Sequence, residues 1–213
     1  MPVPTADPPP KIGLRERNKL DKLTRIRAAA LELFETKGFD ATTTREIAEL
    51  ADVGIGTVFM YANDKRDLLF LIFNDVLDGV VDEAFERVDG RKSLSAQIAI
   101  VFSHFYRAFH ERAGLARIFL RELVFFSQGK QAEQYLENRR RILAGLEGLV
   151  SAAIAKGKVR ASEDPAHVAT VCFFLYSGEI RLWLSAPEPD LEEGIAGLQR
   201  TFGLLGRGLN ERG

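Results

Sequence analysis

Apolar residues recur at spacings of three and four along most of the chain, which is the period of an amphipathic α-helix. One such run starts near Leu20 and ends at Gly38, and "NDKRDLL" opens another over about residues 64–87. Five further runs follow, separated by Gly, Pro and Ser, at about 94–111, 114–127, 132–156, 164–185 and 190–208. No segment alternates between apolar and polar residues as a half-buried strand does, so the pattern predicts an all-α fold of about nine helices.

Two short helices are predicted between the first two long ones. Thr43 stands three residues before Glu46, which is the spacing of a capping box, and a helix is expected over Thr44–Ala51. Another short helix is expected to begin at Gly54 or Ile55 after a turn of three residues. Two short helices joined by so tight a turn predict a helix-turn-helix.

The segment "VGIGTVFMYANDK", residues 53–65, carries more apolar and aromatic residues than so short a helix can bury. In a helix-turn-helix, the second helix packs one face on its own domain and presents the other to the major groove. Val58 and Ala62, four residues apart, are expected on the packed face. The residues expected on or near the exposed face are Ile55, Gly56, Thr57, Phe59 and Met60. Exposed apolar residues usually mark an interface, although on this segment alone residues 53–61 are equally well interpreted as core.

Composition and charge bound the domain organisation. The chain has 213 residues, of which 46% are hydrophobic, enough for a small domain attached to a larger one. Its net charge of -1 gives no global basic field, so a nucleic-acid partner must be met by local charge. We predict a disordered Pro-rich tail and basic arm over 1–20, a helix-turn-helix domain over 21–63 and a larger helical domain over 64–213. The arm is either a solvated flank or a minor-groove contact through Arg15 and Arg17.

Cysteine content and hydropathy indicate the compartment. The single cysteine, Cys172, excludes an internal disulfide and a cysteine-based metal cluster, and no metal or cofactor is predicted. No apolar run approaches the roughly 18 residues that a spanning helix needs, and the N-terminus lacks the apolar core of a signal peptide. We therefore expect a cytoplasmic protein with no membrane partner, which, as a helix-turn-helix protein, associates with the nucleoid when bound to DNA.

The stretch "ATTTREIAELADVGIGTVFMYANDKRDLL" resembles the signature of the TetR family of transcriptional regulators, in order and spacing over residues 23–77. The resemblance implies that Thr43 and Arg45 cap the first short helix and reach DNA phosphates. It implies that Thr57, Phe59 and Met60 meet bases or sugars, and that Tyr61 and Lys65 anchor the backbone. With the exposed residues above, the predicted DNA-binding set is Thr43, Arg45, Ile55, Gly56, Thr57, Phe59, Met60, Tyr61 and Lys65.

Three positions depart from the family pattern. Gly54 replaces a serine N-cap, Phe59 replaces a tyrosine, and Ala62 replaces a phenylalanine. The exposed face then carries no arginine, lysine, asparagine or glutamine for a bidentate base contact. Sequence readout is therefore expected to depend on thymine methyl groups, on Thr57 and on DNA shape.

The resemblance also implies a ligand-binding and dimerising domain in the remaining two thirds of the chain. Aromatic residues at helical spacing are usually core, but their abundance favours an apolar ligand. The predicted ligand-binding set is Phe102, Phe105, Tyr106, Phe109, Phe119, Glu122, Phe126, Phe173, Tyr176 and Trp183. Glu122 is included because an unpaired carboxylate between apolar stretches is costly, and it is expected to face Arg121 or a cationic ligand.

The helices at about 164–185 and 190–208 resemble the family's four-helix dimer interface. The first is apolar almost all round, and the second carries glycines at 194, 197, 203 and 206, which are best explained by close helix approach. A symmetric homodimer would read palindromic double-stranded operator DNA.

The favoured function is a ligand-responsive repressor that is released from its operator by a hydrophobic small molecule. The alternatives are a DNA-binding regulator without an effector, or an activator. An enzyme would need a nucleophile and base or metal ligands at fixed spacing, and the scattered histidines, His104, His110 and His167, offer neither. An architectural DNA binder would not need so large an aromatic domain.

Overall fold

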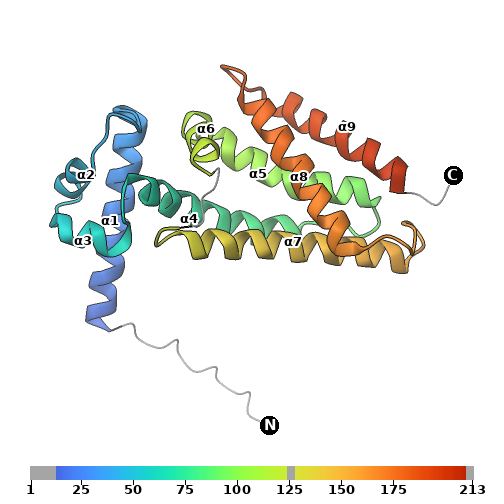
Figure 1. The fold of residues 1–213 in the computed structure, drawn as a ribbon, viewed down its shortest axis with the longest axis horizontal. Coiled ribbons are helices and arrows are strands. Elements are labelled where there is room, and N and C mark those ends of the chain that lie inside the picture. The colour runs from blue at the N-terminus through green and yellow to red at the C-terminus, as the bar shows by residue number, and fades with distance from the viewer. Residues whose placement is uncertain (1–12, 124–127, 210–213) are drawn as a thin grey trace, which may run out of the picture. The chain divides into compact units, whose positions relative to one another are not determined.

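The computed structural model describes residues 13–123 and 128–209, and over these residues the chain forms nine α-helices and no strand (Figure 1). The helices are α1 (Leu14–Thr36), α2 (Thr44–Leu50), α3 (Ile55–Tyr61), α4 (Lys65–Glu86), α5 (Leu94–His110), α6 (Ala113–Glu122), α7 (Ala132–Ala155), α8 (Pro165–Leu184) and α9 (Leu191–Leu209). The predicted all-α fold is confirmed. The chain divides into two compact units, one ending at Tyr61 and the other beginning at Ala62, two residues before the expected boundary.

The first unit is a three-helix domain built from α1, α2 and α3. Its core contains Ile26 and Phe34 of α1, Ile47 of α2 and Val58 of α3, all of them buried. Gly38 ends α1 with φ +92°, a left-handed conformation that glycine adopts without steric cost. The helix therefore stops where the sequence predicted.

Helix α1 begins at Leu14, six residues before the first apolar residue of the predicted run. Residues 14–20, expected to be a basic arm that runs into this helix, form its first two turns, and all of them are exposed. They remain helical without burial because leucine, arginine, glutamate and lysine have high helix propensity. The described part of the basic arm is thus a helical extension of α1, while residues 1–12, which include the tail expected to be disordered, lie outside the described part of the chain.

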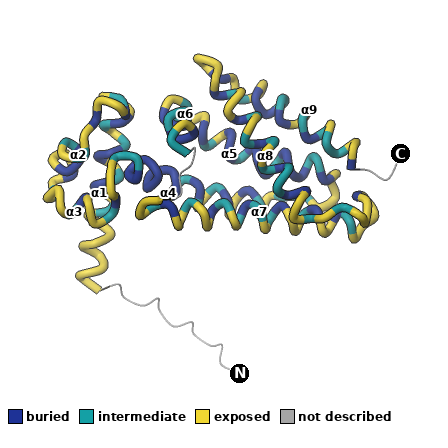
Figure 2. Tube along the Cα trace, in the orientation of Figure 1, coloured by how far each residue is buried: buried dark blue, intermediate teal, exposed yellow. Residues whose placement is uncertain are grey.

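The second unit packs six helices around an aromatic core. Helix α5 packs against α4 and α9, and α7 packs against α4 and α8. Phe73 of α4 and Phe119 of α6 stack with ring centroids 4.2 Å apart, and Phe102 of α5 stacks on Tyr176 of α8 at 4.1 Å. Figure 2 shows the long buried stretches of α4 and α5 that carry this core.

The carboxylate of Asp67 connects the first turn of α4 to the segment that leads into α7. It is buried and accepts hydrogen bonds from the backbone N–H groups of Asn63, Lys130 and Gln131 at 2.9, 2.9 and 3.2 Å. Gly129 has φ +124°, and a Cβ at this position would collide with the Asp67 carboxylate. A charged side chain therefore fixes the start of two helices that are distant in sequence.

Two of the four α9 glycines lie at close approaches within the unit, as predicted. A Cβ on Gly194 would lie 2.6 Å from Nε1 of Trp183, and one on Gly206 would lie 3.0 Å from Cβ of Ser95. A Cβ on Gly197 or Gly203 would contact only side chains, at ordinary van der Waals distance. Close packing within the described part of the chain therefore does not explain why these two positions are glycine.

None of the helices in residues 13–123 and 128–209 has the length and apolarity that crossing a membrane requires.

Candidate DNA-binding surface and effector cavity

Hydrogen bonds within the turn and from α1 stabilise the turn between α2 and α3. Within the turn, the N–H of Val53 donates to the carbonyl of Ala48 at 3.0 Å, and Asp52 has φ +51°. From α1, Arg25 Nη1 donates to the carbonyls of Ala51 and Asp52 at 2.9 and 3.2 Å. No motif in the sequence singles out Arg25 for this role. Its role depends on a contact between α1 and the turn, which spacing does not reveal.

The N-terminus of α2 carries the predicted capping box. The Glu46 carboxylate accepts from the backbone N–H of Thr43 at 3.0 Å, and Thr43 Oγ1 accepts from the N–H of Glu46 at 3.3 Å. The ammonium of Lys37, together with these Thr43 contacts, lowers the pKa of Glu46 to about 2. The carboxylate is therefore ionised at neutral pH, which suits the positive end of the helix.

Helix α3 divides into a buried and an exposed face as the pattern predicted. Val58 is fully buried, whereas Ile55, Phe59 and Met60 are 40%, 43% and 69% exposed. Gly56 is also exposed and Thr57 is half-buried. Three large apolar side chains on one short exposed helix form a surface suited to contact with a partner.

The other residues predicted to contact DNA lie at the N-terminus of α2, at the end of α3 and at the start of α4. Thr43 and Arg45 are exposed, on and beside the N-terminus of α2. Tyr61 is half-buried, and its hydroxyl donates to the carbonyl of Lys19 in α1 at 3.2 Å. Lys65 is the first residue of α4, in the second unit, and is half-buried. Tyr61 therefore also ties α3 to α1, a role that the sequence did not indicate.

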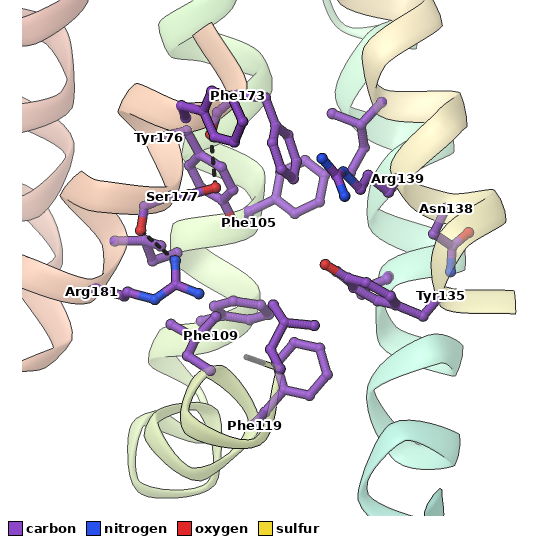
Figure 3. Close-up of a pocket in the computed structure, with 16 residues that line it drawn as sticks. Phe105, Phe109, Phe119, Tyr135, Asn138, Arg139, Phe173, Tyr176, Ser177 and Arg181 are labelled. Carbon is purple, nitrogen blue, oxygen red and sulfur yellow. Dashed lines mark hydrogen bonds between the residues drawn. The ribbon is translucent and has the colours of Figure 1, made fainter. Parts of the chain in front are cut away.

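A cavity of about 260 Å³ lies within the second unit (Figure 3). Its apolar wall comes from α4, α5, α6, α7 and α8, and includes Leu77, Phe105, Phe109, Phe119, Ile142 and Ile180. The volume is just below the range of about 300–1,000 Å³ that is typical of small-molecule sites. The cavity therefore suits a small, largely apolar ligand.

Five of the predicted ligand-binding residues line this cavity, namely Phe105, Phe109, Phe119, Phe173 and Tyr176. Phe102, Tyr106 and Trp183 do not. Phe102 is fully buried between Tyr176 and Phe202, and Tyr106 stacks on Trp183 with centroids 4.7 Å apart. Phe102 and Tyr106 belong to the core because neighbouring rings cover them, whereas Trp183 is half-buried. Phe126 lies outside the described residues.

Glu122 also lies outside the cavity lining. Its carboxylate is paired with Arg121 at 2.9 Å and with Arg66 at 3.7 Å, and its backbone carbonyl accepts from Arg66 Nε at 3.0 Å. Of the two partners expected for this carboxylate, Arg121 or a cationic ligand, the structure shows Arg121, and Arg66 of α4 adds a second positive charge. Glu122 thus joins the end of α6 to the first turn of α4.

The polar lining of the cavity was missed by the sequence analysis. Tyr135, Asn138 and Arg139 of α7 and Ser177 and Arg181 of α8 complete the wall, to which no aspartate or glutamate of residues 13–123 and 128–209 belongs. In Figure 3 the two guanidinium groups and the Tyr135 hydroxyl point toward the same space from different helices. The run "ENRRR" contains Arg139, but nothing in the sequence separates it from the neighbouring solvent-exposed arginine, Arg140.

The outer surface of α8 and α9 carries exposed apolar side chains. Phe174 and Leu182 of α8, eight residues apart on one face, are 60% and 71% exposed, and Leu204 of α9 is 67% exposed. Gly178 of α8 lies midway between the first two and is also exposed. Large apolar residues at helical spacing on an outer surface indicate a protein interface.

The first unit contains a helix-turn-helix whose second helix is exposed, and the second unit is a helical domain with an apolar cavity. Together these two features define the class of DNA-binding transcriptional regulators with a sensor domain. Residues 26–72 match the family model described as bacterial regulatory proteins, tetR family. The chain is also 26% identical over 201 residues to an uncharacterised HTH-type transcriptional regulator, YhgD, of Bacillus subtilis, a match that covers 90% of this chain and 99% of the relative. The match to the family model thus covers the helix-turn-helix and the first turns of α4.

Solved structures of similar fold include two regulators described with acyl-CoA ligands. The transcriptional regulator FadR of Bacillus subtilis, in complex with stearoyl-CoA, superposes with a TM-score of 0.67 at 19% identity, covering 88% of this chain and 99% of that one. The FadR repressor of Thermus thermophilus, in complex with lauroyl-CoA, gives a TM-score of 0.65 at 22% identity, covering 84% and 92%. At these identities the likeness shows that the fold is shared.

Proposed function

We propose that the protein is a repressor that binds a palindromic operator as a homodimer and is released when an apolar acyl compound enters the cavity of its second unit. The observation that carries the proposal is the division of α3 into a buried face at Val58 and an exposed apolar face at Ile55, Phe59 and Met60. Such a face on the second helix of a helix-turn-helix is suited to the major groove, where apolar side chains contact thymine methyl groups.

The proposed dimer forms through the outer surface of α8 and α9. Phe174, Leu182 and Leu204 supply its apolar contacts, and Gly197 and Gly203 leave room for a helix of the second copy to approach closely. In a dimer with two-fold symmetry the same surface of both copies forms the interface, so each of these apolar residues is buried in both subunits. Two recognition helices related by this axis would read two half-sites about one turn of DNA apart, roughly 34–36 Å.

The proposed effector class is supported by the cavity and by the similar structures. Aromatic and aliphatic side chains dominate the wall, and the FadR regulators of similar fold are described in complexes with acyl-CoA. Release requires that the effector bind the form that does not hold DNA more tightly than the form that does. Arg66 and Asp67 link the first turn of α4 to the end of α6 and the start of α7, two helices that contribute to the cavity wall.

The function is tested in two measurements on the full chain. Selection of bound duplexes from a random DNA pool is expected to yield a site with two-fold symmetry. Fluorescence anisotropy of the selected duplex is then expected to fall when fatty acids or acyl-CoA esters of six to twelve carbons are added. A selected site without two-fold symmetry would contradict the proposed dimer. A DNA complex that no compound of this series dissociates would contradict the proposed class of effector.

Met60→Ala is expected to change the preferred DNA sequence without lowering the thermal stability of the protein. Met60 is 69% exposed, so its truncation leaves no cavity in the core, but it removes an apolar contact with base edges worth about 1–3 kcal/mol of discrimination at a base pair. Repeating the selection with the variant measures the change. Leu20→Ala, which truncates an exposed apolar residue of α1, is the matched control and should leave the preference intact. An unchanged preference in Met60→Ala would show that this face does not read bases.

A further inference from the structure

The lining of the effector cavity is asymmetric in charge. Arg139 and Arg181 both contribute to the wall, and among the residues that the structure describes no carboxylate does. The next two arginines of α7 are matched: Arg140 pairs with Glu137 at 2.9 Å and Arg141 with Asp78 at 3.0 Å. A partly buried cation beside an apolar cavity, without a counter-charge, is costly unless a ligand supplies the negative charge.

Arg139 shows the mismatch most clearly. Its Nε is buried and has no hydrogen-bond partner, and its guanidinium lies over the Phe173 ring with the central carbon 5.4 Å from the ring centroid. No ion pair joins Arg139 to any residue in the described part of the chain. A buried donor without a partner lowers the stability of the protein by roughly the free energy of one hydrogen bond. The Nε of Arg139 is therefore suited to an acceptor that a bound ligand would provide.

Arg181 approaches from the other side of the cavity. Its only hydrogen bond among the described residues is a donation from Nη1 to the carbonyl of Ser177, one turn earlier in α8, at 2.7 Å, and the side chain is exposed at the rim. Tyr135 lies within the electrostatic reach of both arginines: burial raises the pKa of its hydroxyl, while Arg139 and Arg181 lower it. The hydroxyl therefore stays protonated at neutral pH, and it points toward the space that the two guanidinium groups also face (Figure 3).

We infer that the effector is a carboxylic acid whose apolar body fills the aromatic cavity and whose carboxylate is bound by Arg139 and Arg181, with Tyr135 beside them. This inference rests on the proposed function and deepens it. A carboxylate attached directly to the apolar body places its charge at the cavity wall, where Arg139 lies. In an acyl-CoA the thioester is uncharged, and the nearest phosphate is separated from it by the whole pantetheine arm. Guanidinium forks also match the planar carboxylate.

Calorimetric titration of the full chain with four probes tests the inference: octanoate, its neutral counterpart octanamide, octanoyl-CoA and coenzyme A. Octanoate is expected to bind roughly 10–100-fold more tightly than octanamide, the range expected for hydrogen bonds to charged groups. Arg139→Met is expected to remove most of this difference while leaving octanamide affinity unchanged. Arg181→Met should act in the same direction. Arg140→Met is the matched control, because Arg140 lies on the same helix, is exposed and is paired with Glu137.

Equal affinity for octanoate and octanamide in the unmodified protein would overturn the inference without depending on the folding of any variant. Binding of octanoyl-CoA without binding of octanoate would also overturn it, while supporting the proposed function. Failure of all acids of six to twelve carbons to bind would overturn it as well. The DNA selection is independent of every one of these results, so loss of the carboxylate preference and loss of the regulator function are distinguished.

Discussion

Leu182→Glu is expected to convert the protein from a dimer into a monomer and to lower its affinity for the selected operator by on the order of 100-fold, the loss expected when two linked half-site contacts become independent. Leu182 is 71% exposed in the isolated chain, although it is a leucine on an outer helix face that also carries Phe174. In an isologous interface one substitution places two glutamates in contact across the axis. Their desolvation and mutual repulsion oppose association.

Sedimentation velocity measures the oligomeric state, and fluorescence anisotropy with the selected duplex measures the affinity. Leu136→Glu is the matched control, because Leu136 is an exposed leucine of α7 in the same unit but on neither of the proposed interface helices. It should remain dimeric and bind the operator normally. A Leu182→Glu protein that is still dimeric at micromolar concentration would show that the dimer forms through another surface.

Asp67→Ala is expected to lower the free energy of unfolding by about 3 kcal/mol, because it leaves backbone donors without their charged acceptor. The carboxylate is buried and accepts from three backbone N–H groups, one before α4 and two before α7. For a chain of this size, each kcal/mol corresponds to a fall of about 2–4 °C in Tm. The variant is therefore expected to melt roughly 6–12 °C lower.

Thermal unfolding followed by circular dichroism measures this effect. Asp64→Ala is the comparison variant, since Asp64 caps the same helix through a single hydrogen bond to the N–H of Asp67 at 2.9 Å. Loss of one helix cap costs about 1 kcal/mol, so its Tm should fall much less. Equal melting of the two variants would mean that the contacts of Asp67 to Lys130 and Gln131 do not contribute to stability.

Local features of the fold were predictable because each depends on residues close together in the chain. The capping box of Thr43 and Glu46 and the end of α1 at Gly38 are confirmed, and α4, predicted to open at about residue 64, has Asp64 as its N-cap. The start of α1 was placed too late, because apolar periodicity reports which part of a helix is buried and not how far the helix extends. Residues 14–20 are helical but bury nothing.

The cavity was only partly predictable. Aromatic abundance indicated an apolar site, but it did not separate Phe105 and Phe109, which line the cavity, from Phe102 and Tyr106, whose rings are covered by other rings. All four lie on α5 within two turns. Which of them faces open space depends on how α8 and α9 pack over this helix, and helical spacing carries no information about that packing.

The sequence by itself determined the nine-helix pattern, the helix-turn-helix and the division of α3 into a buried and an exposed face, because helix periodicity and capping are encoded by residues within a few positions of one another. The tertiary structure alone decided that Arg25 holds the turn, that Asp67 joins α4 to α7, and that Arg139 and Arg181 share one cavity. Each of these contacts joins residues from helices far apart in the chain. Their charges acquire a role only when packing brings them to the same place and removes the water that would otherwise solvate them.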